Sequence, residues 1–242
     1  MSTVTSRVRR EKYLHGWREP VSSRPAATIL LLRDTPRGPE VLMTRRSPSA
    51  SFAPGAYVFP GGVVDPMDSS PAARAVSIWR PDQPEDLLAY AAAAVRESFE
   101  ELGILLAQPQ APDVDLAAAI GRLPRHPDER FYERLSDAGL RLALDKLHWL
   151  SRWVTDRDMP KRFDTRFFAA RMPEGQQPTA DETEQFEPTW VLPAEALERH
   201  ESGSFEMIFP TIRTLRALAR FGDVDSLLKH CGENPGAWVS TP

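Results

Sequence analysis

Residues 91–104, with the sequence AAAAVRESFEELGI, constrain what this chain can fold into more than any other stretch. On a helix that turns about 100° per residue, Glu97, Glu100 and Glu101 fall within one narrow sector, and the apolar side chains cover the opposite side. Like charges at these spacings repel each other by roughly 0.2–0.5 kcal/mol per pair. A divalent cation would turn this repulsion into attraction, because hard cations bind carboxylate oxygens. The competing interpretation is a solvated acidic helix face, and this stretch alone does not choose between the two.

The composition of the chain excludes several classes of protein. With 30 Lys and Arg against 34 Asp and Glu, the net charge of -4 offers no basic surface for a nucleic acid. No apolar run approaches the roughly 18 residues of a membrane-spanning helix, and the charged amino-terminal segment lacks the apolar core of a secretory signal. Cys231 is the only cysteine, which excludes an internal disulfide and a zinc site built from several cysteines. We therefore expect a cytoplasmic protein that binds neither nucleic acid nor membrane.

The first half of the chain predicts a strand hairpin followed by the acidic helix. Residues 1–25 are polar and predict an irregular lead-in to a single domain over residues 26–242. Apolar runs predict strands over 27–33 and 40–45, and the tandem glycines Gly61 and Gly62 mark a sharp turn. The helix is predicted over 85–102, with Asp82 and Glu85 as a capping box and Gly103 just past its end. Residues 104–107 are expected to return to the sheet.

The second half predicts further helices around two more strands. Its helical pattern over 113–150 is read as an insertion, which would form either a lid or a contact within a homodimer. Strands are predicted within 162–171 and at 189–192, and Pro193 fits the first position of a helix. A last amphipathic helix is predicted over 209–230.

The second of the tandem glycines and the glutamates of the predicted helix belong to one longer sequence pattern. The residues Gly62, Arg96, Glu97, Glu100, Glu101, Gly103 and Ile104 agree with the pattern G-x5-E-x7-R-E-U-x-E-E-x-G-U, in which U is aliphatic. The chain thus resembles the Nudix hydrolases. Asp68 stands at the position of the first glutamate and Ser98 at that of an aliphatic residue, and 27 residues separate Asp68 from Arg96 where the pattern has seven.

A second signature lies upstream of the helix. Its agreeing residues are Leu42, Thr44, Arg46, Ser47, Gly55, Phe59, Pro60, Gly61 and Gly62. This segment is similar to the L-L-T-x-R-S-x3-R-x3-G-x3-F-P-G-G signature of coenzyme A diphosphatases, with Met43 in place of a leucine and Ser51 in place of an arginine. The enlarged box and the RFDTRFF segment further on look most like the peroxisomal-type branch of these enzymes.

The resemblance implies a fold, a reaction and a set of site residues. The fold would be the α/β class, a Nudix α/β/α sandwich with a mixed sheet and extra helical insertions. The reaction would be the metal-dependent hydrolysis of a diphosphate linkage in a small-molecule nucleotide, with Mg²⁺ or Mn²⁺ as cofactor. The implied metal ligands are Glu97, Glu101, Glu100 and the backbone of Gly61; the implied catalytic residues are Glu100, Glu184 and Arg96; the implied substrate-binding residues are Arg46, Ser47, Phe59 and Gly62.

Two of these assignments stay open. The general base is either Glu100 or Glu184, which precedes Trp190 by six positions as in the family's E-x5-W spacing. Arg96 would orient Glu100 through an ion pair. For the substrate, coenzyme A or an acyl-coenzyme A is the first candidate, giving 3′,5′-ADP and (acyl-)phosphopantetheine. The alternatives are ADP-ribose or NAD(H), and, in a different class, a Nudix-fold nucleotide-binding regulator without catalysis.

Overall fold

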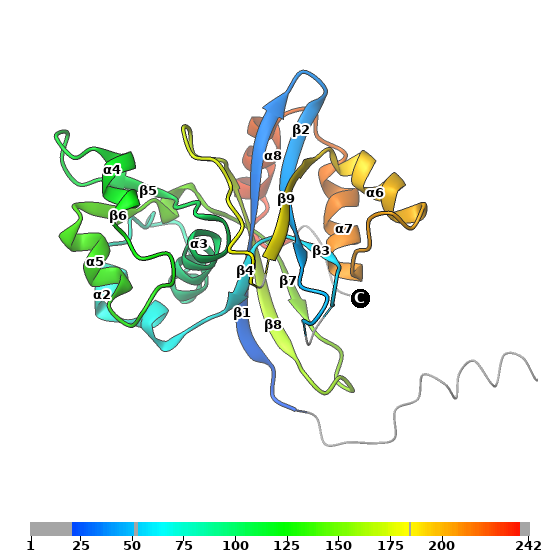
Figure 1. The fold of residues 1–242 in the computed structure, drawn as a ribbon, viewed down its shortest axis with the longest axis horizontal. Helices are drawn as coiled ribbons and strands as arrows, with labels where there is room; N and C mark the ends of the chain where they lie inside the picture. The colour runs from blue at the N-terminus through cyan, green and yellow to red at the C-terminus, as the bar shows by residue number, and fades with distance from the viewer. Residues whose placement is uncertain (1–20, 51–52, 184, 238–242) are drawn as a thin grey trace, which may run out of the picture.

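A mixed seven-stranded sheet forms the centre of the protein (Figure 1). The computed structural model describes residues 21–50, 53–183 and 185–237. The strands of this sheet are β1 (Arg24–Thr35), β2 (Gly38–Arg46), β3 (Tyr57–Val58), β4 (Gly61–Val63), β7 (His148–Val154), β8 (Phe163–Arg171) and β9 (Gln185–Val191). They follow the order β3-β2-β1-β8-β7, with β4 paired to β1 and β9 paired to β2. Only the β1–β8 pair in this sheet is parallel among the pairings of the described residues.

Strand β1 is central because its residues are apolar on both sides. Ile29 and Leu31 face the acidic helix, and Leu30 and Leu32 face the carboxy-terminal helices, and all four are buried. An uninterrupted apolar run is typical of a strand that is covered on both faces. The predicted hairpin is confirmed, since β1 and β2 pair as antiparallel strands.

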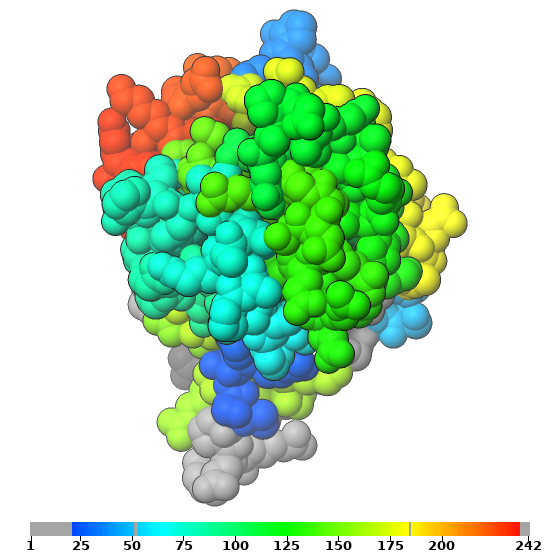
Figure 2. Space-filling view, turned by 90° about the vertical axis from the view of Figure 1, so that its left-hand side faces the viewer, coloured from blue at the N-terminus to red at the C-terminus, as the bar shows by residue number. Residues whose placement is uncertain are grey.

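One face of the sheet carries the acidic helix and the segments that surround it. These are η1 (Pro66–Ser69), α2 (Pro71–Ala75), η2 (Glu85–Leu87), α3 (Leu88–Leu102), β5 (Ala107–Pro109), α4 (Leu116–Gly121), α5 (Phe131–Asp137), β6 (Leu140–Leu142) and η3 (Leu144–Lys146). Helix α3 packs its alanine-rich side on β1. Residues of the range 105–145 form much of the outer surface on this side (Figure 2).

The other face is covered by three helices at the end of the chain. They are α6 (Pro193–Glu201), α7 (Phe209–Leu218) and α8 (Val224–Glu233), and they share a second apolar core with β1, β2, β7, β8 and β9. Helices on both faces of a mixed sheet confirm the predicted α/β/α sandwich. No helix in the described part of the chain is long and apolar enough to cross a membrane.

The structure differs from the predicted helical insertion over 113–150. Gly139, at a φ of 69°, follows α5, and the chain then forms β6 and, from His148, the edge strand β7 of the main sheet. A short apolar run does not distinguish a strand from a helix by its periodicity alone. The expected return of residues 104–107 to the main sheet is also wrong, because β5 pairs with β6 in a separate two-stranded sheet.

Three predicted boundaries also need correction. Strand β1 already begins at Arg24, inside the predicted lead-in, of which residues 1–20 lie outside the described part. The single helix over 209–230 is two helices, because the Asp223 side chain accepts a hydrogen bond from the Ser226 amide and starts α8 anew. The capping box forms at Asp65 and Asp68 on η1, whereas η2 has no side-chain cap.

Gly103 ends α3 at a φ of 69°, a left-handed conformation that its position predicted. We expect Gly103→Ala to lower the free energy of unfolding by about 1–2 kcal/mol, because a Cβ is strained in this conformation. Gly121→Ala is the matched control, since a Cβ at Gly121 meets no atom within 4 Å and the residue ends a helix with an ordinary φ. Urea denaturation measures both, and equal stability of the two variants would contradict the interpretation.

Candidate active site

A buried ion pair between Arg96 on α3 and Asp68 on η1 fixes the geometry of the acidic helix. Arg96 Nε lies 2.9 Å from Asp68 Oδ1 and Arg96 Nη2 lies 3.0 Å from Asp68 Oδ2, with the two residues 4% and 0% exposed. Asp68 also accepts hydrogen bonds from the Tyr132 hydroxyl and from the backbone amide of Asp65. Both oxygens of Asp68 are thus engaged, and the carboxylate holds Arg96 in place.

Arg96 in turn contacts the glutamates of the helix. Its Nη1 donates a hydrogen bond of 2.8 Å to Glu97 Oε1 and lies 3.6 Å from Glu100 Oε2. Its Nη2 donates to the backbone carbonyl of Val63 at the end of β4. The guanidinium therefore links the helix to β4, the strand that begins with the tandem glycines Gly61 and Gly62.

Glu97 lies against β4. A Cβ at Gly62 would come within 2.5 Å of Glu97 Cδ, so only glycine permits this approach of backbone and carboxylate. Burial raises the pKa of Glu97 to about 7, and the opposing charge of Arg96 limits the rise. Glu97 is thus a carboxylate in a site that disfavours its negative charge.

Glu101, one turn further, is held by backbone and side-chain donors. The Gly61 amide donates to Glu101 Oε2 at 3.0 Å, and Gln185 Nε2 on β9 donates to Glu101 Oε1 at 2.8 Å. Gln185 is fixed by the hydroxyl of Thr44, which donates to its Oε1 at 2.7 Å. Burial, together with repulsion from Glu97, still raises the pKa of Glu101 well above its usual range.

Glu101 is buried and Glu97 is largely buried, with its side chain 15% exposed, and the two carboxylates repel each other. A divalent cation would remove this repulsion and take their oxygens, and Mg²⁺ commonly uses one or two protein carboxylates beside water and phosphate oxygens. Their donor chemistry therefore fits a hard cation. Within residues 21–50, 53–183 and 185–237, however, no group of three or more His, Cys, Asp or Glu side chains is arranged to hold a metal by itself.

Two further predicted site residues, Glu100 and Arg46, differ in how they interact with this part of the site. Glu100 is more exposed and contacts Arg96 and, at 3.9 Å, His126. The positive charge of Arg46 acts on Glu101, whereas Arg45 pairs with Glu187, which matches the alternation of side chains along a strand.

Two predicted substrate residues have local partners, and one predicted base lies outside the described residues. Ser47 Oγ lies 2.8 Å from Ser49 Oγ at the surface. Phe59 is 4% exposed and packs edge-on against Phe167 in the core beneath the carboxy-terminal helices, so its ring is a core side chain here. Glu184 falls outside the described part of the chain.

Sequence reasoning missed three supporting residues. Gln185 positions Glu101, Tyr132 holds Asp68, and Arg125 donates from its Nε to the backbone carbonyl of Glu100 at 3.0 Å. In the sequence, Gln185 is distinguished only by its place next to Glu184. Thr44, which binds Gln185, is distinguished only by its place in the upstream signature. Tyr132 and Arg125 lie in the inserted segment, for which no local motif existed.

The raised pKa of Glu97 predicts a pH-dependent stability of the metal-free protein. A carboxyl whose pKa rises from 4.5 to about 7 on folding stabilises the protein below pH 4.5, and the gain is lost as the pH rises through 7. In EDTA, we expect the wild type to lose about 2–3 kcal/mol relative to Glu97→Gln between pH 4.5 and pH 8. Urea denaturation at the two pH values measures this difference.

The control for this experiment is Glu133→Gln, which removes an exposed carboxylate paired with Arg130 on α5. It should follow the pH dependence of the wild type. A difference between wild type and Glu97→Gln that stays constant with pH would contradict the burial of an ionisable Glu97.

Comparison with known proteins gives several relatives. The chain is 32% identical to acyl-coenzyme A diphosphatase NUDT19 of Homo sapiens, over 89% of this chain and 69% of that protein. It is 30% identical to putative nudix hydrolase 7 of Caenorhabditis elegans, over 86% of this chain and 65% of that protein. No family model matches the chain.

A solved structure supports the same relationship. The crystal structure of a NUDIX hydrolase from Alicyclobacillus acidocaldarius superposes with a TM-score of 0.74 at 31% sequence identity, covering 86% of this chain and 96% of that one. Both sequence and fold thus agree with the pattern of glycine, arginine and glutamates around α3. The chain belongs to the Nudix hydrolases, a family of enzymes.

Proposed function

We propose that this enzyme hydrolyses the diphosphate linkage of coenzyme A or of an acyl-coenzyme A. The products would be 3′,5′-ADP and (acyl-)phosphopantetheine. The observation that carries the proposal is the similarity to acyl-coenzyme A diphosphatase NUDT19 along 89% of the chain. The upstream signature from Leu42 to Gly62 and the buried carboxylate pair on α3 support it.

Diphosphate hydrolysis sets two demands that these residues meet. The linkage is surrounded by negative oxygens, so attack by water requires neutralisation of charge and a positioned nucleophile. Glu97 and Glu101 would hold Mg²⁺ or Mn²⁺, which supplies charge neutralisation and lowers the pKa of bound water. Arg46, whose positive charge acts on Glu101, would pair with a phosphate oxygen, since guanidinium groups bind phosphates through paired hydrogen bonds.

The remaining residues position these groups. Tyr132 holds Asp68, Asp68 holds Arg96, and Arg96 would orient Glu97 and Glu100. Gln185 and the Gly61 amide orient Glu101 from the opposite side. A general base, Glu100 or Glu184, would take a proton from the attacking water. The added water oxygen ends on one phosphate, and the bridging oxygen leaves with the other.

Glu101→Gln tests the metal assignment. Replacing a carboxylate by an amide removes the charge that attracts the cation while keeping the size of the side chain. We expect kcat/KM to fall at least about 100-fold, together with weaker Mn²⁺ binding measured by titration calorimetry. Glu133→Gln on α5 is the matched control and should retain both. Unchanged hydrolysis and Mn²⁺ affinity in Glu101→Gln would refute the carboxylate pair as the metal site.

A substrate panel tests the identity of the diphosphate. Purified protein is incubated with Mg²⁺ or Mn²⁺ and with coenzyme A, hexanoyl-coenzyme A, ADP-ribose or NADH, and the products are separated by chromatography. We expect 3′,5′-ADP from the first two compounds at a kcat/KM at least tenfold above that of the others, and no product in EDTA. Cleavage of ADP-ribose or NADH with coenzyme A left intact would assign the alternative substrate.

A further inference from the structure

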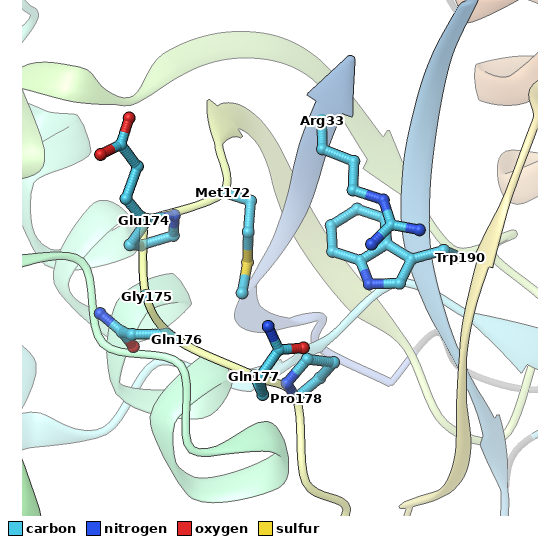
Figure 3. Close-up of a pocket in the computed structure, with 9 residues that line it drawn as sticks. Arg33, Met172, Glu174, Gly175, Gln176, Gln177, Pro178 and Trp190 are labelled. Carbon is cyan, nitrogen blue, oxygen red and sulfur yellow. The ribbon is translucent and has the colours of Figure 1, made fainter. Parts of the chain in front are cut away.

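A pocket lies between the sheet and the segment that follows β8. It has a volume of about 220 Å³ and is lined by Arg33, Trp190 and residues 172–178 (Figure 3). Arg33 on β1 stacks on the Trp190 ring of β9, with its Cζ 4.2 Å from the ring centroid. Met172 and the Gln177 amide point into the space on the opposite side (Figure 3).

The pocket is built into the same substructure as the carboxylate pair. Trp190 and Met172 pack on the apolar cluster that contains α3, so the pocket opens on the α3 face of the sheet. Its wall is tied to the end of α3, since the Gln176 side chain exchanges two hydrogen bonds with the backbone of Leu105. The same segment continues to Asp181, whose amide donates to the carbonyl of Glu101. One segment thus connects the pocket with the site of hydrolysis.

Strand geometry gives the distance between the two sites. Gln185, which contacts Glu101, and Trp190, which lines the pocket, pair with Arg46 and Leu42, so across the bulge in β9 they lie as far apart as four residues of β2. At about 3.3 Å per residue this separation is roughly 13 Å. It is too long for groups bonded directly to the diphosphate. An extended pantetheine arm of about a dozen bonds, each about 1.3–1.5 Å long, reaches on the order of 15 Å.

The charges of the pocket select an uncharged ligand. The guanidinium of Arg33 is paired with Glu40 at 2.6 Å, and Glu174 adds a carboxylate to the rim. A phosphate would find no net positive charge here. Met172, Pro178 and Trp190 offer apolar surface, and Gln177 offers an amide donor and acceptor. These groups match a chain that contains amides and a sulfur atom.

We propose that this pocket binds the thiol or thioester end of the pantetheine arm while the diphosphate lies at Glu97 and Glu101. This inference rests on the proposed function and adds the part of the substrate that the pocket would recognise. Contacts that bind this unreactive end equally in the ground state and in the transition state lower KM without raising kcat. Filling the pocket should therefore raise KM and leave kcat unchanged.

Gln177→Trp tests the pocket by filling it from an exposed position. With coenzyme A and hexanoyl-coenzyme A, we expect KM to rise about tenfold at a kcat within about twofold of the wild type. The inhibition constant of 3′,5′-ADP, which lacks the arm, should stay the same. Lys229→Trp is the control, since Lys229 is exposed on α8, on the opposite face of the sheet. Melting temperatures of both variants check that the fold is retained.

Two results would overturn the pocket assignment alone. One is a KM of Gln177→Trp that does not exceed that of Lys229→Trp. The other is an inhibition constant of 3′,5′-ADP that rises in Gln177→Trp as much as KM does. If the wild type cleaves no coenzyme A compound, the proposed function fails, and titration calorimetry with pantetheine then decides the pocket separately. Pantetheine binding that is present in the wild type and lost in Gln177→Trp supports the pocket assignment. Absence of pantetheine binding to the wild type overturns it.

Discussion

The ion pair between Arg96 and Asp68 is the contact on which the geometry around α3 depends. Both side chains are buried, and each is hydrogen-bonded to further groups, which is the condition under which a buried charge pair is tolerated. Removing one partner of such a pair typically costs about 3–5 kcal/mol, because the other charge is left without compensation. The same guanidinium that satisfies Asp68 also fixes Glu97, so stability and site geometry rest on one group.

This contact also explains how the chain accommodates 27 residues between Asp68 and Arg96. The entropic cost of closing a longer loop grows only logarithmically with its length. The insertion after α3 offsets part of this cost by contributing the buried Tyr132, whose hydroxyl binds Asp68. The added segments therefore form part of the support of the site, in addition to covering one face of the sheet (Figure 2).

The sequence predicted what depends on local spacing. The position of α3, its end at Gly103 and the hairpin of β1 and β2 follow from periodicity and turn residues, and the glutamate spacing indicated a carboxylate site. The partner of each carboxylate could not be predicted, because Gln185 meets Glu101 across 84 positions. The strand from His148 was read as helix, since pairing with β8 decides the structure of a short apolar run.

The two supports of Glu101 give its carboxylate an orientation that neither would give alone. Gly61 begins β4 and Gln185 begins β9, so two separate strands of the sheet hold one side chain of the helix. Gln185 is itself held by Thr44 on β2, which pairs with β9. Both hydrogen bonds lower the pKa of Glu101, although burial still raises it well above its usual range. Because two strands fix its oxygens and a third holds Gln185, the cost of bringing Glu101 into position is met during folding, before any cation or substrate binds.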